Sequence, residues 1–167
     1  MIFGEGQIDN FDKIYYDNFY SYINSNIEHL TELKNKYIKL MSELTLCEEL
    51  DNENFYNKLK EINSIGSIII AYKYTKNEKS IEIIGSGSII IEPKIIRGAK
   101  SVGHIEDIVV KSTFRGKKIS QTILSKLKDF AESKNCYKVI LDCDQSVCPV
   151  YMSNGFEVKG IQMGLYF

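Results

Sequence analysis

The spacing of apolar residues changes once along this chain, and that change limits the folds open to it. Across Ile27–Leu44 apolar side chains recur every three or four residues, which predicts a helix. A second, shorter helix is predicted over Asp51–Ile62, with Asp51 as its N-cap. From residue 67 onward the helical spacing is lost, and Ser67–Tyr74 and Ile81–Glu92 have the composition of strands. The first half of the chain is therefore expected to pass from helices into a sheet.

The second half is predicted to mix strands and helices. After a basic loop over Pro93–Gly103, the expected elements are a strand over His104–Lys111, a helix over Lys117–Lys134, a strand over Tyr137–Cys143, a short helix over Ser146–Ser153, and closing strands at 156–158 and 161–167. The apolar run of Tyr137–Cys143 predicts burial on both faces of that strand. This order indicates an α/β (α+β) fold with a mixed sheet, rather than an evenly alternating parallel one.

The length of 167 residues suits one compact domain. Residues 1–20 show no clear period and are expected to form an N-terminal extension, so that the single domain spans residues 21–167.

Charge and hydropathy give no sign of a nucleic-acid or membrane partner. Lys and Arg number 21 against 22 Asp and Glu, for a net charge of -1, and no segment approaches the roughly 20 apolar residues of a membrane span. The first residues are polar and acidic, unlike a signal peptide. A cytoplasmic protein is the expectation.

The four cysteines (Cys47, Cys136, Cys143 and Cys148) form no CxxC pair and, with two histidines, match no zinc-ligand spacing. They are expected to be free thiols packed as small apolar groups, and no metal is expected.

One segment carries a signal for phosphate binding. A strand, a short turn and a helix follow one another at Gly103–Lys134, and the helix opens beside Arg115, Lys117 and Lys118. A helix N-terminus offers unpaired backbone N–H groups and the positive end of its dipole, which favours phosphate. From these residues alone, a solvated helix start is an equally good interpretation.

Four sequence strings, taken together, point to one family. GHIEDIVV, RGKKIS, CYKVILDC and YMSNGF occur in the order and spacing of the GNAT superfamily of acetyl-CoA-dependent N-acetyltransferases, and the chain resembles in particular its glucosamine-6-phosphate N-acetyltransferases. The similarity is dense from Ile89 to Phe167, thinner over Thr31–Ile62, and absent from residues 1–20. The resemblance implies a GNAT fold, in which a splayed strand pair binds acetyl-CoA. It also implies direct attack of an amine on the thioester, with no covalent enzyme intermediate.

The resemblance also assigns residues to the coenzyme. It places the pyrophosphate on a loop and helix start made by Arg115, Gly116, Lys117, Lys118, Ile119, Ser120 and Gln121, and the pantetheine arm along Ile108, Val109 and Val110. Lys118 and Ser120 stand where the family has glycines. The family's asparagine before the short helix is Val147 in this chain.

For the reaction, the resemblance implies Glu106, Asp142 and Tyr151 as catalytic residues. Glu106 and Asp142 would orient the amine and accept its proton, and Tyr151 would stabilise or protonate the leaving thiolate. The implied substrate-binding residues are Thr45, Lys94, Arg97, Glu106, Asp107, Tyr137, Lys138 and Asp142. A homodimer is expected, because an apolar closing strand suits pairing at a sheet edge.

Two other interpretations stay open at this point. The chain could acetylate a different amine, such as a polyamine or a protein N-terminus, although the basic loop argues against a cationic acceptor. It could also be a non-catalytic module that binds acetyl-CoA, in which the glycines lost from the phosphate loop mark lost activity.

Overall fold

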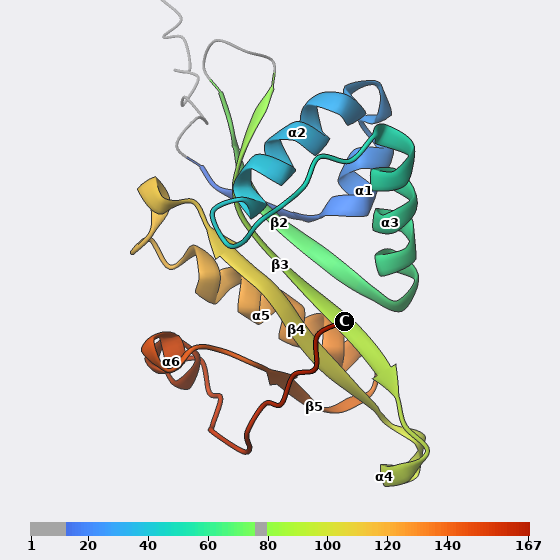
Figure 1. Ribbon diagram of the computed structural model, residues 1–167, viewed down its shortest axis with the longest axis vertical. Helices are drawn as coiled ribbons and strands as arrows, with labels where there is room; N and C mark the ends of the chain where they lie inside the picture. Colours follow the sequence, from blue (N-terminus) through green and yellow to red (C-terminus); the bar gives the residue numbers. More distant parts are fainter. Residues whose placement is uncertain (1–12, 76–79) are drawn as a thin grey trace, which may run out of the picture.

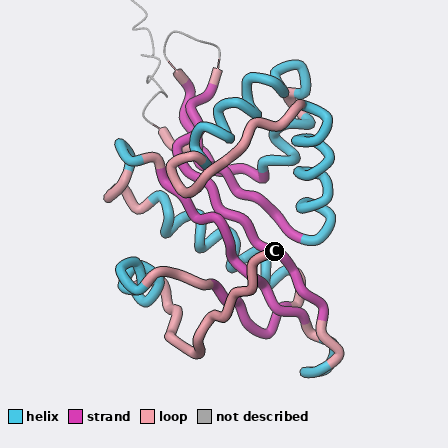
Figure 2. The backbone as a smooth tube through the Cα atoms, viewed as in Figure 1, coloured by secondary structure: helices cyan, strands magenta, loops and turns pink. Residues whose placement is uncertain are grey.

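The computed structural model describes residues 13–75 and 80–167, and in this part of the chain five strands form one sheet (Figures 1 and 2). The strands are β1 (Tyr15–Asn18), β2 (Gly66–Tyr74), β3 (Ile81–Pro93), β4 (Ser101–Val110) and β5 (Cys136–Leu141), in that spatial order. Neighbouring strands from β1 to β4 are antiparallel, and β4 and β5 are parallel. This confirms a mixed, mostly antiparallel α/β fold.

The helices are α1 (Phe19–Asn24), α2 (Leu30–Met41), α3 (Asn52–Ile65), α4 (Ile96–Ala99), α5 (Ile119–Ser133) and α6 (Cys148–Met152). Short 3-10 turns occur at Ile27–His29, Ser112–Phe114 and Gln145–Val147. The predicted N-cap of α3 is confirmed, because the Asn54 amide donates to the Asp51 carboxylate at 2.7 Å. Within residues 13–75 and 80–167, no helix is long and apolar enough to cross a bilayer.

One face of the sheet is covered by α1, α2 and α3 (Figure 1). Phe19 of α1, Leu33 of α2 and Phe55 of α3 are buried together against Ile68 and Ile70 of β2. The helical spacing of these side chains is what directs them onto the sheet, since residues three or four apart share one side of a helix.

The opposite face is covered by α5. Ile123, Leu124 and Leu127 are completely buried against Ile84 and Ile89 of β3. Because successive strand residues point to opposite faces, the isoleucine-rich strands contribute side chains both to the core under α1–α3 and to the core under α5. The start of α5 is thereby held beside the end of β4.

A bulge interrupts β4 where the predicted catalytic residues lie. Ser88 of β3 pairs with Glu106 and Ser86 pairs with Val109, so that Asp107 and Ile108 together face the single residue Gly87. A Cβ at Gly87 would lie 2.4 Å from the Ile108 side chain, and only glycine leaves that space. Asp107 adopts a positive φ of 53° in the bulge, a conformation found at functional sites more often than elsewhere.

Two predictions about the carboxyl-terminal part are wrong. Residues 156–158 and 161–167 are not strands, because they do not pair with β5 or with any other described strand, and a strand needs a hydrogen-bonded neighbour. For the same reason β5 is an edge strand, and its residues are half-buried or exposed rather than buried on both faces. The predicted loop over Pro93–Gly103 is shorter, since β4 already begins at Ser101 and pairs there with Pro93.

The predicted boundary at residue 20 also differs from the structure. Tyr15–Asn18 forms β1 beside β2, and Phe19 is completely buried, so this segment belongs to the folded body. The absence of a period misled the prediction because a strand of four residues is too short to show one. The rest of the predicted extension, residues 1–12, lies outside the described residues.

Candidate active site

The sheet opens beside the bulge. β4 pairs with β5 only over Ser101–Ile105, and no described strand lies next to Glu106–Val110 on that side. The Glu106 carbonyl accepts a hydrogen bond from the Ser88 hydroxyl, and the Val110 carbonyl accepts one from the Arg115 side chain. The other backbone groups on this side have no strand partner and can bind an extended, amide-containing ligand as a strand would. Ile108, Val109 and Val110, predicted to bind the pantetheine arm, lie on this stretch.

The turn after β4 leads into α5 and carries the predicted phosphate site. Gly116 has a φ of 77°, and Lys118, the N-cap of α5, has a φ of 60°. The side chains of Arg115, Lys117 and Lys118 are exposed, whereas Ile119 is buried in the core below α5. The first backbone N–H groups of α5, which include those of Ser120 and Gln121, have no partner within the helix, and the helix dipole adds positive potential there. This end of α5 can hold a phosphate.

The left-handed backbone at Lys118 explains why the resembling family has glycine at this position. A residue with a Cβ is disfavoured there by roughly 1–2 kcal/mol. We therefore expect Lys118→Gly to raise the melting temperature and to leave coenzyme affinity intact or tighter, as measured by thermal unfolding and by titration with CoA. Lys117→Gly is the matched control, because it removes one charge without changing a left-handed residue. A large loss of CoA affinity in Lys118→Gly alone would show instead that the lysine ammonium holds a phosphate.

The predicted catalytic residues Glu106 and Tyr151 and the predicted substrate-binding residue Asp107 have shifted pKa values. The pKa of Glu106 is raised by partial burial and by the nearby negative charges of Asp107 and Asp142. Burial also raises the pKa of Asp107. The pKa of the Tyr151 hydroxyl is raised by burial first, and then by Cys143 and Glu106. Asp142 and Tyr151 line one cavity, and Glu106 lies close enough to raise the pKa of Tyr151 and to be affected by Asp142, although the three residues come from β4, the end of β5 and α6.

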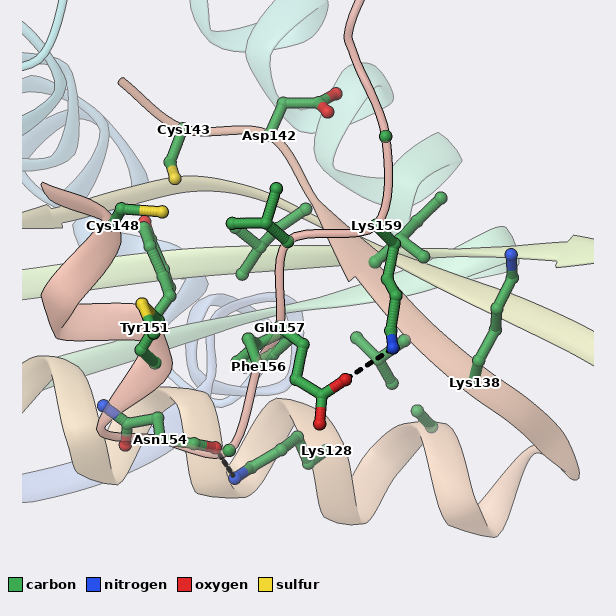
Figure 3. Close-up of a pocket in the computed structure, with 18 of the residues that line it drawn as sticks. Lys128, Lys138, Asp142, Cys143, Cys148, Tyr151, Asn154, Phe156, Glu157 and Lys159 are labelled. Carbon is green, nitrogen blue, oxygen red and sulfur yellow. Dashed lines mark hydrogen bonds and ion pairs between the residues drawn. The ribbon is translucent and has the colours of Figure 1, made fainter. Parts of the chain in front are cut away.

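A cavity of about 800 Å³ lies between α5, β5, α6 and the carboxyl-terminal segment (Figure 3). Asp142 and Tyr151 line it, and the Asp142 carboxylate accepts a hydrogen bond from the Gln162 side chain at 3.2 Å. Tyr151 is held by edge-to-face contact with Phe156, whose ring centroid is 6.1 Å away. Fixed on a short helix in this way, the Tyr151 hydroxyl can donate a proton to a group bound in the cavity.

The predicted substrate residues fall into two groups. Thr45 follows Glu43 by two residues. The Glu43 carboxylate accepts a 2.7 Å hydrogen bond from the Ser112 amide just after β4, which places this segment near the end of that strand. The other group lies at the start of β5, where the Arg97 guanidinium and the Lys138 ammonium are 5.9 and 5.7 Å from the centre of the Tyr137 ring. Lys94 forms an ion pair with Glu92 on the same hairpin.

Within one chain Lys94 and Arg97 do not line the cavity that contains Asp142 and Tyr151. Tyr137 and Asp142 are five residues apart along β5, which corresponds to about 16 Å. Tyr137 and Lys138 line the cavity together with Asp142, but Arg97 and Lys94 do not. This separation could not be predicted from the order of residues, because residues of one binding site need not share one end of a strand.

Two cysteines of the cavity were not predicted as functional residues. Cys143 directly follows Asp142, and Cys148 precedes Tyr151 by three residues, so that Cys148 and Tyr151 share one side of α6. That helical spacing was the available signal. In the part of the chain that the structure describes, no three His, Cys, Asp or Glu side chains are grouped closely enough to hold a metal ion.

Fold and site together define a class of protein. The model of the acetyltransferase (GNAT) family matches residues 31–156, and the chain belongs to this family. Two similar proteins are glucosamine 6-phosphate N-acetyltransferases: that of Arabidopsis thaliana is 36% identical over 83% of this chain and 92% of that protein, and that of Dictyostelium discoideum is 35% identical over 95% of this chain and 86% of that protein. The crystal structure of glucosamine-6-phosphate N-acetyltransferase from Arabidopsis thaliana superimposes with a TM-score of 0.77 at 31% identity, covering 93% of this chain and 99% of the other.

Proposed function

We propose that this protein transfers the acetyl group of acetyl-CoA to the 2-amino group of D-glucosamine 6-phosphate. The products would be N-acetyl-D-glucosamine 6-phosphate and CoA, on the route to UDP-N-acetylglucosamine in the cytoplasm. The observation that carries the proposal is that Asp142 and Tyr151 line one cavity, while Glu106, at the open edge of β4, electrostatically influences Tyr151 and is influenced by Asp142. The activity named for the similar proteins of Arabidopsis and Dictyostelium supports this substrate.

The residues of the chain fit acetyl-CoA as the acyl donor. The stretch Glu106–Val110 has no neighbouring strand on one side and can offer backbone groups to the amides of an extended arm. Arg115, Lys117 and Lys118 surround the helix N-terminus with cations suited to a pyrophosphate. A backbone N–H of the bulge can also donate to the thioester oxygen as negative charge develops on it.

The acid–base groups divide the proton transfers between them. An amine attacks only when it is neutral, and the Glu106 carboxylate can accept its proton directly or through a water molecule, while Asp142 orients the amine. The raised pKa of Tyr151 keeps its hydroxyl protonated at neutral pH, so that it can donate to the departing thiolate. Direct attack needs no nucleophile from the protein.

We further propose that two copies of the chain associate. Ile161, Met163 and Leu165 alternate along the carboxyl-terminal segment and are 79–94% exposed, which is the pattern of a strand that lacks its sheet. β5 is an edge strand of the described sheet, so its free edge can pair with such a strand from a second copy. Light scattering should show a dimer, and removal of residues 161–167 should give monomers.

The function is tested by the release of CoA from acetyl-CoA with glucosamine 6-phosphate, glucosamine and spermidine as competing acceptors. Fastest turnover with glucosamine 6-phosphate is expected, because the exposed cations favour a phosphorylated acceptor. Turnover with spermidine alone would replace the proposed substrate by a polyamine. No turnover with any amine, with CoA still bound, would make the protein a binding module.

Glu106→Gln is expected to separate activity from stability. The amide cannot accept the amine proton, so the rate should fall about a hundredfold. The folded-state pKa of Glu106 is raised, and its ionisation therefore opposes folding above the ordinary carboxyl pKa. The variant should melt at a higher temperature than the wild type at pH 7, and this difference should vanish as the pH falls below the unfolded pKa. Glu48→Gln, an exposed loop change, is the control for both measurements.

A further inference from the structure

Two thiols lie together at the wall of the cavity. Cys143 follows the end of β5 and Cys148 is the first residue of α6, and the four residues between them are folded into a compact turn. In that turn the Asp144 carboxylate accepts a hydrogen bond from the Ser146 amide at 2.8 Å, and the Val147 amide donates to the Asp144 carbonyl at 3.1 Å. Figure 3 shows the two sulfur atoms directed toward each other. The turn thus holds the thiols face to face.

The pair also borders the Tyr151 hydroxyl. Cys148 and Tyr151 occupy one side of α6, and in Figure 3 the hydroxyl points toward the sulfur atoms. The effect of Cys143 on the Tyr151 pKa agrees with this proximity. A change at either sulfur is therefore felt at the group assigned to the leaving thiolate.

The other two cysteines are placed differently. Cys47 packs against the core beneath α1–α3, and Cys136 packs against the α5 core at the opposite end of β5. Cys47, Cys136 and Cys148 are all partly exposed and Cys143 is exposed, so what distinguishes Cys143 and Cys148 is that they lie together where a small oxidant can reach both.

We propose that Cys143 and Cys148 form a reversible disulfide when the protein meets a low-molecular-weight disulfide such as oxidised glutathione, and that this bond lowers acetyl transfer. The inhibitory part rests on the proposed function, whereas formation of the bond does not. A reversible thiol pair of this kind suits a reducing compartment, where protein disulfides are mostly transient or redox-sensing.

The chemistry balances through a mixed disulfide. Desolvation and, after it, the hydrogen bond to Cys148 raise the pKa of the Cys143 thiol. Only a thiol that has lost its proton attacks a disulfide, so in the proposed sequence Cys148 gives its proton to solvent and attacks first. Attack on the oxidised glutathione breaks its S–S bond, forms a Cys148–glutathione bond and releases one glutathione thiolate. Cys143 then loses its proton to solvent and displaces the second glutathione. The two cysteines are oxidised by two electrons in total, and one disulfide is reduced to two thiols.

The disulfide would lower the rate of acetyl transfer by moving the Tyr151 hydroxyl. It joins the end of β5 to the first turn of α6 and removes both S–H groups from the cavity wall. Since a shift of about 1 Å at a catalytic group can cost roughly a hundredfold in rate, the displaced Tyr151 hydroxyl should serve the leaving thiolate poorly.

The test uses the full chain, treated with oxidised glutathione and then freed of it. Peptide mass mapping should find Cys143 linked to Cys148 with the loss of two hydrogen atoms, and the rate of CoA release should fall roughly tenfold or more and return after treatment with dithiothreitol. Cys143→Ser and Cys148→Ser are each compared with their own reduced form and should lose the reversible response. Cys47→Ser keeps the pair and should respond as the wild type does.

Each outcome decides the proposal. If the reduced protein is active but no Cys143–Cys148 link forms, the thiol pair is not a redox site. If the link forms and the rate is unchanged, the bond does not regulate the reaction. If the link forms in a protein that has no acetyltransferase activity in either state, the redox site stands and the proposed function falls.

Discussion

Replacing Tyr151 with phenylalanine should lower the turnover rate of acetyl transfer roughly a hundredfold while leaving the KM for both substrates within a few-fold of the wild type. The ring packs against Phe156 and lines the cavity wall, so the phenyl group keeps the shape of the site. What is lost is the Tyr151 hydroxyl proton beside the thiols of the cavity wall, where the coenzyme sulfur is expected to leave. An interaction made only as the thiolate departs contributes to kcat and not to binding.

A second measurement shows whether the hydroxyl acts on the leaving group. An acetyl donor whose thiol is more acidic than CoA needs less help in leaving, so the defect of Tyr151→Phe should shrink with such a donor. Tyr56→Phe is the matched control, because it removes a tyrosine hydroxyl hydrogen-bonded to Asn24 on the far helical layer. An unchanged kcat in Tyr151→Phe would take the proton-donor role away from this residue.

Most of the fold could be predicted because its elements are locally encoded. The apolar spacing of α2, α3 and α5 survives in the structure, and their buried residues are those that the helical period selects. The isoleucine runs of β2 and β3 are likewise sufficient to mark strands. Where a side chain's burial follows from its neighbours three, four or two residues away, one sequence is enough.

The errors occur at both ends of the chain, where structure depends on a distant partner. β1 is four residues long and is a strand only because β2 lies beside it. The segment 161–167 has the alternation of a strand and yet has no strand next to it in the described chain. The local sequence pattern indicates that a segment can form a strand, but the segment becomes a strand only where another strand lies beside it.

The candidate site shows the same division. Glu106 and Tyr151 were found because their surroundings match a family pattern, and the structure brings them together. The bulge that reorients Asp107 depends on Gly87, twenty residues earlier, and on the Ile108 side chain that fills the space above it. The thiol pair of Cys143 and Cys148 depends on how a four-residue turn folds. Neither arrangement follows from composition or period.

Leu127→Ala should be the most damaging single core change on the α5 side of the sheet, lowering the free energy of unfolding by about 2–5 kcal/mol. Leu127, on α5, is completely buried against the sheet. A Cβ added at Gly87 of β3 would lie 3.3 Å from a methyl group of Leu127, so helix and sheet are in contact at this point. The lost methyl groups would leave a cavity that helix and sheet cannot close without moving. In a domain of this size each kcal/mol lowers the melting temperature by about 2–4 °C, which calorimetry or urea unfolding can measure.

The same substitution should weaken coenzyme binding without touching it. α5 carries the phosphate site at its first turn, and Leu127 is one of the side chains that hold this helix against β3 and the bulge of β4. A helix that is free to shift presents its N–H groups less accurately, so the Kd for CoA should rise several-fold at temperatures where the variant is still folded. Leu46→Ala, at a side chain that is 87% exposed, should change neither quantity. A destabilised Leu127→Ala that binds CoA as tightly as the wild type would show that the phosphate site is held by its own turn, Arg115–Lys118, and not by the core beneath α5.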